Sequence, residues 1–126
     1  MFDRLQIQID HESRIPIYDQ IELQIKSLII GGHLPSGCAL PSLRELAAQA
    51  PCSVITTRRV YQNLEQNGYI ETLQGKGTFV KAMSEQEQET QKYMLVNEAV
   101  KRAIDIGRRC GYADSAIKEM FVRALR

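Results

Sequence analysis

The sequence lacks the residues and patterns of several protein classes. It has no tryptophan, two isolated histidines and three widely spaced cysteines, Cys38, Cys52 and Cys110, without a C-x-x-C pair. An odd cysteine count without that pair argues against a disulfide framework or a structural zinc site, so neither metal nor cofactor is expected. Cys52 has the position of a small buried residue in a turn, with a redox-active thiol as the alternative.

Long apolar runs are also missing. None approaches the ~20 residues that cross a bilayer, and the opening MFDRLQIQIDHES has no basic region followed by an apolar core. A cytoplasmic chain without a membrane partner is therefore expected. Its apolar fraction of 44% and charged fraction of 25% are those of a globular domain.

An excess of positive charge is absent as well, because the net charge is only +1. Many DNA-binding domains are strongly basic, so the bulk charge gives no sign of a nucleic acid. The local distribution does, since Arg58 and Arg59 are the only charged residues between Leu46 and Leu64. A nearly neutral protein binds a polyanion when its few cations converge, and dimerisation doubles their number.

What the sequence does contain begins with one expected strand and one expected helix. Leu5, Ile7 and Ile9 alternate with glutamines, which predicts a short half-buried strand. Behind Pro16, an apolar stripe recurs at helical spacing until Gly31 and Gly32, and it consists of Ile17, Tyr18, Ile21, Ile25, Leu28 and Ile29. This first helix is expected to belong to the core.

Residues 41–68 predict a helix-turn-helix. Ser42 and Glu45 form a capping box, so a short second helix begins at Leu43 and ends before Pro51. Ser53 can cap a third helix, which ends near a glycine at position 68. Two helices separated by a turn of about three residues have the helix-turn-helix arrangement.

A glycine-tipped hairpin follows directly. Residues 69–73 and 78–81 are rich in β-formers, and Lys76 lies between Gly75 and Gly77 in the tip. A hairpin directly behind a helix-turn-helix indicates a wing. The expected fold is therefore mainly α, an α+β winged helix-turn-helix.

The third helix is predicted to have a buried face and an outward face. At ~100° per residue, Thr57, Val60, Tyr61 and Leu64 cluster on the buried face. The opposite side carries Ile55, Arg59, Gln62 and Gln66 with Arg58 at its edge, and the first turn adds the hydroxyls of Ser53, Thr56 and Thr57.

These residue types suit the major groove of DNA. Arginine can bind guanine in bidentate fashion, glutamine can pair with adenine, threonine can reach a base edge or a phosphate, and Ile55 could touch a thymine methyl. An ordinary solvated helix face is the alternative. The capping box, the turn and the wing together favour DNA.

Two further cations are candidates for DNA contacts. Arg44, at the start of the second helix, can clamp a backbone phosphate, with a salt bridge to a carboxylate such as Glu65 as the alternative. Lys76 at the wing tip can reach a phosphate or the minor groove, and an ordinary exposed turn lysine is its alternative.

The last part of the chain predicts two helices that dimerise. One follows a polar acidic stretch and runs to about residue 109, and Asp114 can cap the other. The last helix carries a continuous apolar stripe of Ile117, Met120, Phe121, Ala124 and Leu125. An uncovered stripe would be a sticky patch, so a two-fold homodimer is expected, with packing on the chain's own first helix as the alternative. A two-fold protein implies a near-palindromic operator with half-sites ~10 bp, or a multiple of that, apart.

The sequence resembles the winged-helix domain of GntR-family bacterial transcription regulators over about residues 15–81. The matching motifs are PIYDQI, LPSLRELA, TTRRVYQNLEQNGYIE and GKGTFV, in that order. The short tail resembles that of the YtrA-type branch, because larger members carry an effector domain that 45 residues cannot hold.

The resemblance implies a dimeric repressor of an adjacent transporter-type operon. It places Arg44 as a phosphate contact, Ser53, Thr56, Arg58 and Arg59 in the recognition helix, and Gly77 in a wing that enters the minor groove. Pro51 replaces a usual glycine, and Val54-Ile55 replaces a polar pair, so the operator sequence is not predictable from it.

The expected organisation is a DNA-binding domain over residues 1–81 and a two-helix dimerisation appendage over residues 82–126. The expected function is a dimeric, sequence-specific DNA-binding transcription regulator. A winged-helix protein-interaction module without DNA binding is the alternative from another class. No nucleophile triad, metal cluster or phosphate-binding glycine motif is present, so an enzyme is not expected. The sequence identifies no effector.

Overall fold

The computed structural model describes residues 5–126, which form two units, one up to Ser84 and one from Glu85 to Arg126. The first unit contains α1 (Ile17–Ile30), α2 (Leu43–Gln49), α3 (Val54–Gln66), β1 (Ile70–Leu73) and β2 (Gly77–Val80). The second contains α4 (Glu85–Arg109) and α5 (Asp114–Ala124). The order is that of a winged helix-turn-helix with a helical tail, which confirms the predicted fold class. None of the helices within residues 5–126 combines the length and apolar character that crossing a membrane requires.

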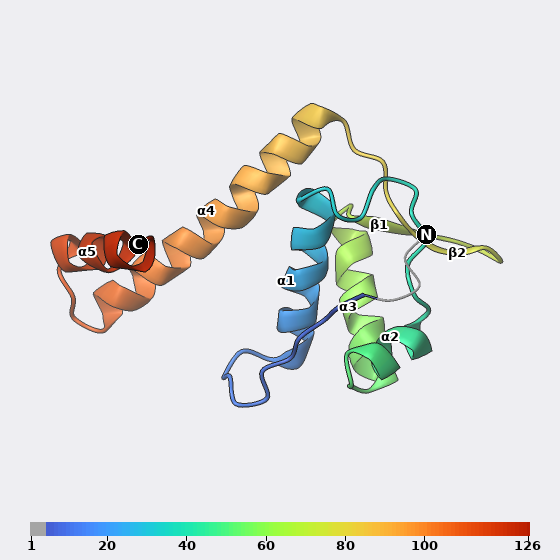
Figure 1. The fold of residues 1–126 in the computed structure, drawn as a ribbon, viewed down its shortest axis with the longest axis horizontal. Helices are drawn as coiled ribbons and strands as arrows, with labels where there is room; N and C mark the ends of the chain where they lie inside the picture. The colour runs from blue at the N-terminus through green and yellow to red at the C-terminus, as the bar shows by residue number, and fades with distance from the viewer. Residues whose placement is uncertain (1–4) are drawn as a thin grey trace. The chain divides into compact units, whose positions relative to one another are not determined.

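The core of the first unit lies between α1, α3 and the hairpin. Figure 1 shows α1 and α3 side by side, with α2 near the N-terminal end of α3. The apolar faces of α1 and α3 are fully buried. Ile21 and Ile25 of α1 and Val60 and Leu64 of α3 have no exposed surface. Burial of such side chains is the main force that holds the three helices together.

Local capping signals set the ends of the helices. The side chain of Ser42 accepts a hydrogen bond from the Glu45 N–H, and the Glu45 carboxylate accepts one from the Ser42 N–H, so the predicted capping box is confirmed. The bond from the Ser42 backbone N–H to the carboxylate lowers the pKa of Glu45, and the Ser42 side chain lowers it further. At the far end of α3, Gly68 has a φ of +82°. The Gly68 and Tyr69 N–H groups donate to the carbonyls of Glu65 and Leu64, which makes a Schellman cap.

Residues 5–10 do not form the predicted strand, although Leu5 and Ile7 are buried and Gln6 and Gln8 are exposed as expected. The backbone partners of this segment are glutamine side chains. Gln24 of α1 accepts from the Gln8 N–H and donates to the Gln8 carbonyl, and Gln20 does the same with residue 10. Gln20 and Gln24 are four residues apart in α1, which is a rise of about 6 Å, and residues 8 and 10 are about 6.6 Å apart in an extended chain. Because the two spacings match, side chains on neighbouring turns of α1 can bind every second residue of the extended segment.

The wing is a two-stranded antiparallel hairpin extended by one bridge. β1 pairs with β2 in the register Ile70 with Val80 and Leu73 with Gly77. The loop before α2 adds a bridge from Ala39 to Phe79 on the other edge of β2. The hairpin is therefore tied to the segment that leads into the helix-turn-helix.

The second unit is a helical hairpin with a close contact between its two helices. Ile117 of α5 is buried against α4, and a Cβ added to Gly107 would lie 2.8 Å from its Cδ1 atom. Glycine at position 107 therefore permits the close approach of the two helices. Asp114 is not the predicted cap, because Ala113 holds that position and the Asp114 carboxylate binds Arg108.

We predict that Tyr61→Phe lowers the free energy of unfolding by about 1 to 2 kcal/mol, because it leaves a buried carbonyl without its donor. The Tyr61 hydroxyl donates to the Pro41 carbonyl at 2.7 Å, and burial raises its pKa far above the usual value. Urea unfolding of the wild-type chain and the variant measures the difference. Tyr112→Phe is the matched control, because Tyr112 is 52% exposed, and it should change nothing.

Candidate nucleic-acid interface

The outward face of α3 is set by what its inner face buries. Thr57, Val60, Tyr61 and Leu64 are buried, and the opposite side presents Ile55, Gln62 and Gln66 to solvent. The Ile55 side chain is 81% exposed, a high value for a large apolar residue. This face is long enough to enter a groove, because thirteen residues of helix rise about 20 Å.

Ser53 and Thr56 lie together at the start of α3. Ser53 Oγ accepts a hydrogen bond from the Thr56 N–H at 3.1 Å and lies 2.8 Å from Thr56 Oγ1. The side chain of Ser53 therefore caps the helix as predicted. Both residues keep exposed surface, and both can still offer a hydroxyl oxygen or proton to a ligand.

Thr57 was predicted as a DNA contact, and the structure corrects this. Its side chain is fully buried, and its hydroxyl donates to the carbonyls of Leu43 and Val54 at 3.0 and 2.9 Å. The bond to Leu43 joins α3 to the first turn of α2. Thr57 therefore fixes the angle of the helix-turn-helix and has no surface with which to reach DNA.

The side chains of Arg44 and Arg58 are exposed and can reach a ligand. Neither forms an ion pair with another of residues 5–126. The alternative of a bridge from Arg44 to Glu65 is not observed, because a Glu65 carboxylate oxygen instead accepts a hydrogen bond from the Thr72 N–H at 2.7 Å. That bond fastens β1 to α3. Sequence reasoning gave Glu65 no such role, since the pairing of a helix carboxylate with a wing amide is not local.

Arg59 is exposed but not free. Its guanidinium carbon lies 3.7 Å from the centre of the Tyr18 ring of α1, the distance of a stacked cation–π pair. Tyr18 was assigned only to the apolar stripe of the first helix, so its contact with a candidate DNA residue was missed. The i, i+3, i+4 pattern that placed Tyr18 in this stripe gives no sign of the contact.

Glu22 of α1 is a nearly buried carboxylate, 9% exposed, whose charge interacts with that of Arg59. Burial raises its pKa above the usual value, and the charge of Asp19 raises it further. The charges of Lys26 and Arg59 and a hydrogen bond with Asn63 oppose this rise. The boundary between α1 and α3 is therefore polar on the side where Arg59 emerges.

The wing tip presents Lys76 and Gly77 to solvent. The Lys76 N–H donates to the Leu73 carbonyl at 2.9 Å, which closes the turn. Gly75 and Gly77 have φ angles of +77° and +122°, so the turn uses backbone conformations that side chains disfavour. The tip is narrow, and its one charged side chain is a cation.

A shallow groove of about 190 Å³ separates α3 from the wing. Its wall mixes hydroxyls, an amide, one charge of each sign and an apolar side chain of α2. The lining residues are Leu43, Arg58, Tyr61, Gln62, Glu65, Thr72 and Thr78. Among residues 5–126, no cluster of histidine, cysteine or carboxylate side chains could hold a metal ion. Burial raises the pKa of the Cys52 thiol, which disfavours the reactive thiolate.

The predicted dimerisation stripe on α5 divides into two parts. Ile117 is covered by α4 of the same chain, and Phe121 is half-buried. Met120, Ala124 and Leu125 are exposed, Leu125 to 86%. The structure adds exposed apolar residues on α4 that were not proposed for an interface, Tyr93, Val96 and Ile106.

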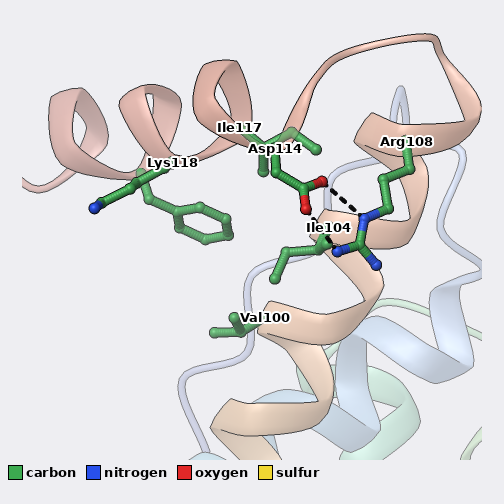
Figure 2. Close-up of a pocket in the computed structure, with 7 residues that line it drawn as sticks. Val100, Ile104, Arg108, Asp114, Ile117 and Lys118 are labelled. Carbon is green, nitrogen blue, oxygen red and sulfur yellow. Dashed lines mark hydrogen bonds and ion pairs between the residues drawn. The ribbon is translucent and has the colours of Figure 1, made fainter.

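An apolar pocket of about 350 Å³ lies between α4 and α5 (Figure 2). Val100, Ile104 and Ile117 line it, and the Arg108–Asp114 pair closes one end. Two parallel hydrogen bonds of 2.9 and 3.0 Å join that pair. The bonds from Arg108 hold the pKa of Asp114 below its ordinary value. The pair tethers the start of α5 to the end of α4.

The family model and the similar proteins point to one family of transcription regulators. Residues 17–80 match the family model of bacterial regulatory proteins, gntR family. The HTH-type transcriptional repressor YtrA of Bacillus subtilis (strain 168) is 39% identical over 98 residues, which cover 78% of this chain and 75% of that protein.

Two solved structures show the same fold. A transcriptional antiterminator from Listeria monocytogenes EGD-e is 27% identical with a TM-score of 0.73, over 98% of this chain and 92% of that chain. AraR(DBD) in complex with operator ORX1 is 29% identical with a TM-score of 0.55, over 61% of this chain and 96% of that chain.

We predict that Glu22 makes the folded state less stable as pH rises. Its pKa is raised on folding, so its contribution is most favourable below the ordinary glutamate pKa and is lost as pH rises through the folded value. Glu22→Gln should remove this loss. Urea unfolding of the wild-type chain and the variant, from acidic to neutral pH, gives the free energy of unfolding as a function of pH for each. If the two curves run parallel, Glu22 is not the group responsible for the loss of stability.

Proposed function

Because the chain belongs to the GntR family of bacterial transcription regulators, we propose that it is a homodimeric repressor that binds an operator in duplex DNA. The family and the relatives named above are transcription regulators and not enzymes. The proposed repressor controls an adjacent transporter-type operon, as the resemblance to the YtrA-type branch implies. The observation that carries the DNA proposal is the free outward face of α3, with Arg58 and Gln62 exposed beside the wing.

The proposed docking places α3 in the major groove. A helix is about 10–12 Å across and the groove about 12 Å wide, so outward side chains meet bases and sideways ones meet the phosphate walls. Arg58 suits guanine, Gln62 suits adenine, and Ile55 suits a thymine methyl. Ser53 and Thr56 offer hydroxyls at the start of the helix. The proposal leaves Thr57 out, because its side chain is buried.

Arg44 and the wing complete the proposed footprint. Arg44 is exposed in the first turn of α2, where it can bind a phosphate and fix the register. Lys76 and Gly77 form a narrow tip that suits the minor groove. The organisation proposed is a DNA-binding domain over residues 1–81 and a dimerisation appendage over residues 82–126.

The tail supports the dimer part of the proposal. No residue of the 25-residue helix α4 is buried within a single chain, although it carries Tyr93, Val96 and Ile106. Exposed apolar side chains in such number mark a surface that another molecule covers. A second copy gives a two-fold dimer and therefore a near-palindromic operator, with half-sites ~10 bp or a multiple of that apart.

We predict that Arg58→Ala and Arg44→Ala weaken DNA binding in different ways. Loss of a bidentate base contact costs about 1–3 kcal/mol per half-site, so a dimer with Arg58→Ala in both protomers should bind about thirtyfold or more weakly and lose preference at one position of each half-site. Arg44→Ala should weaken all sequences alike and reduce the slope of log affinity against log salt by about 2 in a dimer.

The measurement is fluorescence anisotropy with an operator selected from random duplexes and its single-position variants, repeated at several salt concentrations. Lys101→Ala is the control, because it removes one exposed positive charge from α4. Failure of the wild-type chain to select or bind any duplex would contradict the proposal.

We predict that Met120→Glu converts the dimer to a monomer, because it places a charge within the exposed α5 stripe. Val122→Glu is the matched control, since Val122 is similarly exposed but lies off that stripe. Sedimentation equilibrium over a range of concentrations gives the mass of each. A monomeric wild-type chain, or two variants that both remain dimeric, would contradict an interface at Met120.

A further inference from the structure

We propose that Tyr18 is a positioning residue for DNA binding, and that it holds Arg59 for a phosphate contact at the wall of the major groove. The inference rests on the proposed DNA-binding function and assigns Arg59 to the backbone instead of a base. It also gives a role in recognition to a residue of α1, the helix that sequence reasoning placed wholly in the core.

The first observation is the stacked pair itself. The Arg59 guanidinium carbon lies 3.7 Å from the Tyr18 ring centre, so the ring covers one face of the planar group. The edge of a guanidinium carries its N–H donors, and stacking leaves that edge free. Arg59 is exposed, so these donors face solvent and can reach a ligand.

The second observation is the position of the pair on α3. Neighbouring residues of a helix point about 100° apart, and Arg58 lies on the wing side, in the groove lined by Thr72 and Thr78. Arg59 is directed to the other side, against α1. The central outward positions belong to Ile55 and Gln62. A side chain held sideways by α1 meets the phosphate wall when the helix fills the groove.

The third observation is the set of charges around Arg59. Glu22, at 9% exposure, is the carboxylate of the same α1 boundary, and its hydrogen bond is with Asn63. The charges of Arg59 and Glu22 interact, but the two side chains are not among the ion pairs within 4 Å that residues 5–126 form. The ring therefore orients the guanidinium without occupying its hydrogen-bond donors.

The test is a double-mutant cycle on operator affinity with Arg59→Ala, Tyr18→Leu and the double variant. Arg59→Ala should reduce the salt slope by about 2 in a dimer, one phosphate contact per protomer, and leave the base preferences unchanged. Tyr18→Leu should weaken binding about threefold per half-site, the worth of an exposed cation–π pair. The double variant should bind no more weakly than Arg59→Ala alone.

Tyr18→Phe is the conservative control, because it keeps the ring face, and it should bind like the wild-type chain. A merely structural role for Tyr18 predicts the opposite results: additive effects in the cycle and a loss of affinity independent of Arg59. Arg59→Ala changes only an exposed side chain, so its salt slope tests the proposal even where Tyr18→Leu lowers stability.

Three outcomes overturn the inference. An unchanged slope in Arg59→Ala removes the phosphate contact, and a changed preference at one base position makes Arg59 a base contact. Additive Tyr18 and Arg59 effects remove the positioning role. In each of these cases the wild-type chain still binds its operator, so the proposed function stands. Absence of any wild-type binding overturns both proposals.

Discussion

The burial of one face of α3 is the constraint on which the rest of the structure depends. Val60 and Leu64 have no exposed surface, and the hydroxyls of Thr57 and Tyr61 donate to the carbonyls of Leu43 and Pro41, on either side of the capping serine that starts α2. Rotation of α3 about its axis would break both hydrogen bonds and expose the apolar side chains. Because the inner face cannot turn, Ile55, Arg58 and Gln62 face outward in every copy. A fixed outward face is what sequence-specific recognition requires.

The elements around α3 hold the other parts of the proposed interface in fixed relation to it. The Thr72 N–H donates to Glu65, so the wing is fastened to the same helix that carries Arg58. Tyr18 restrains Arg59 from the opposite side. The bridge between Ala39 and Phe79 links the wing to the segment that enters α2 and leads to Arg44. Arg44, Arg58, Arg59 and Lys76 of the wing tip therefore stand on one connected scaffold. This arrangement makes a net charge of +1 compatible with a polyanionic ligand.

The features that sequence reasoning placed correctly depend on neighbouring residues. The capping box at Ser42, the cap at Ser53, the glycine after α3 and the hairpin tip all follow from hydrogen bonds or backbone angles within a few positions. Two of the errors come from partners far along the chain. The segment 5–10 alternates like a strand, but its backbone binds glutamine side chains of α1. Thr57 has the residue type of a DNA contact, but the carbonyl of Leu43 takes its hydroxyl. The stacking of Arg59 on Tyr18 likewise joins two helices, and no local pattern encodes it.

The central claim is that α3 enters the major groove while the wing tip enters the minor groove. Dimethyl sulfate tests both at once, because guanine N7 lies in the major groove and adenine N3 in the minor groove. On an operator selected from random duplexes, we expect two groups of protected guanine N7 atoms ~10 bp, or a multiple of that, apart. We expect protection of adenine N3 atoms beside each group, lost when residues 75–77 are shortened. Binding that leaves every guanine N7 reactive would contradict the account.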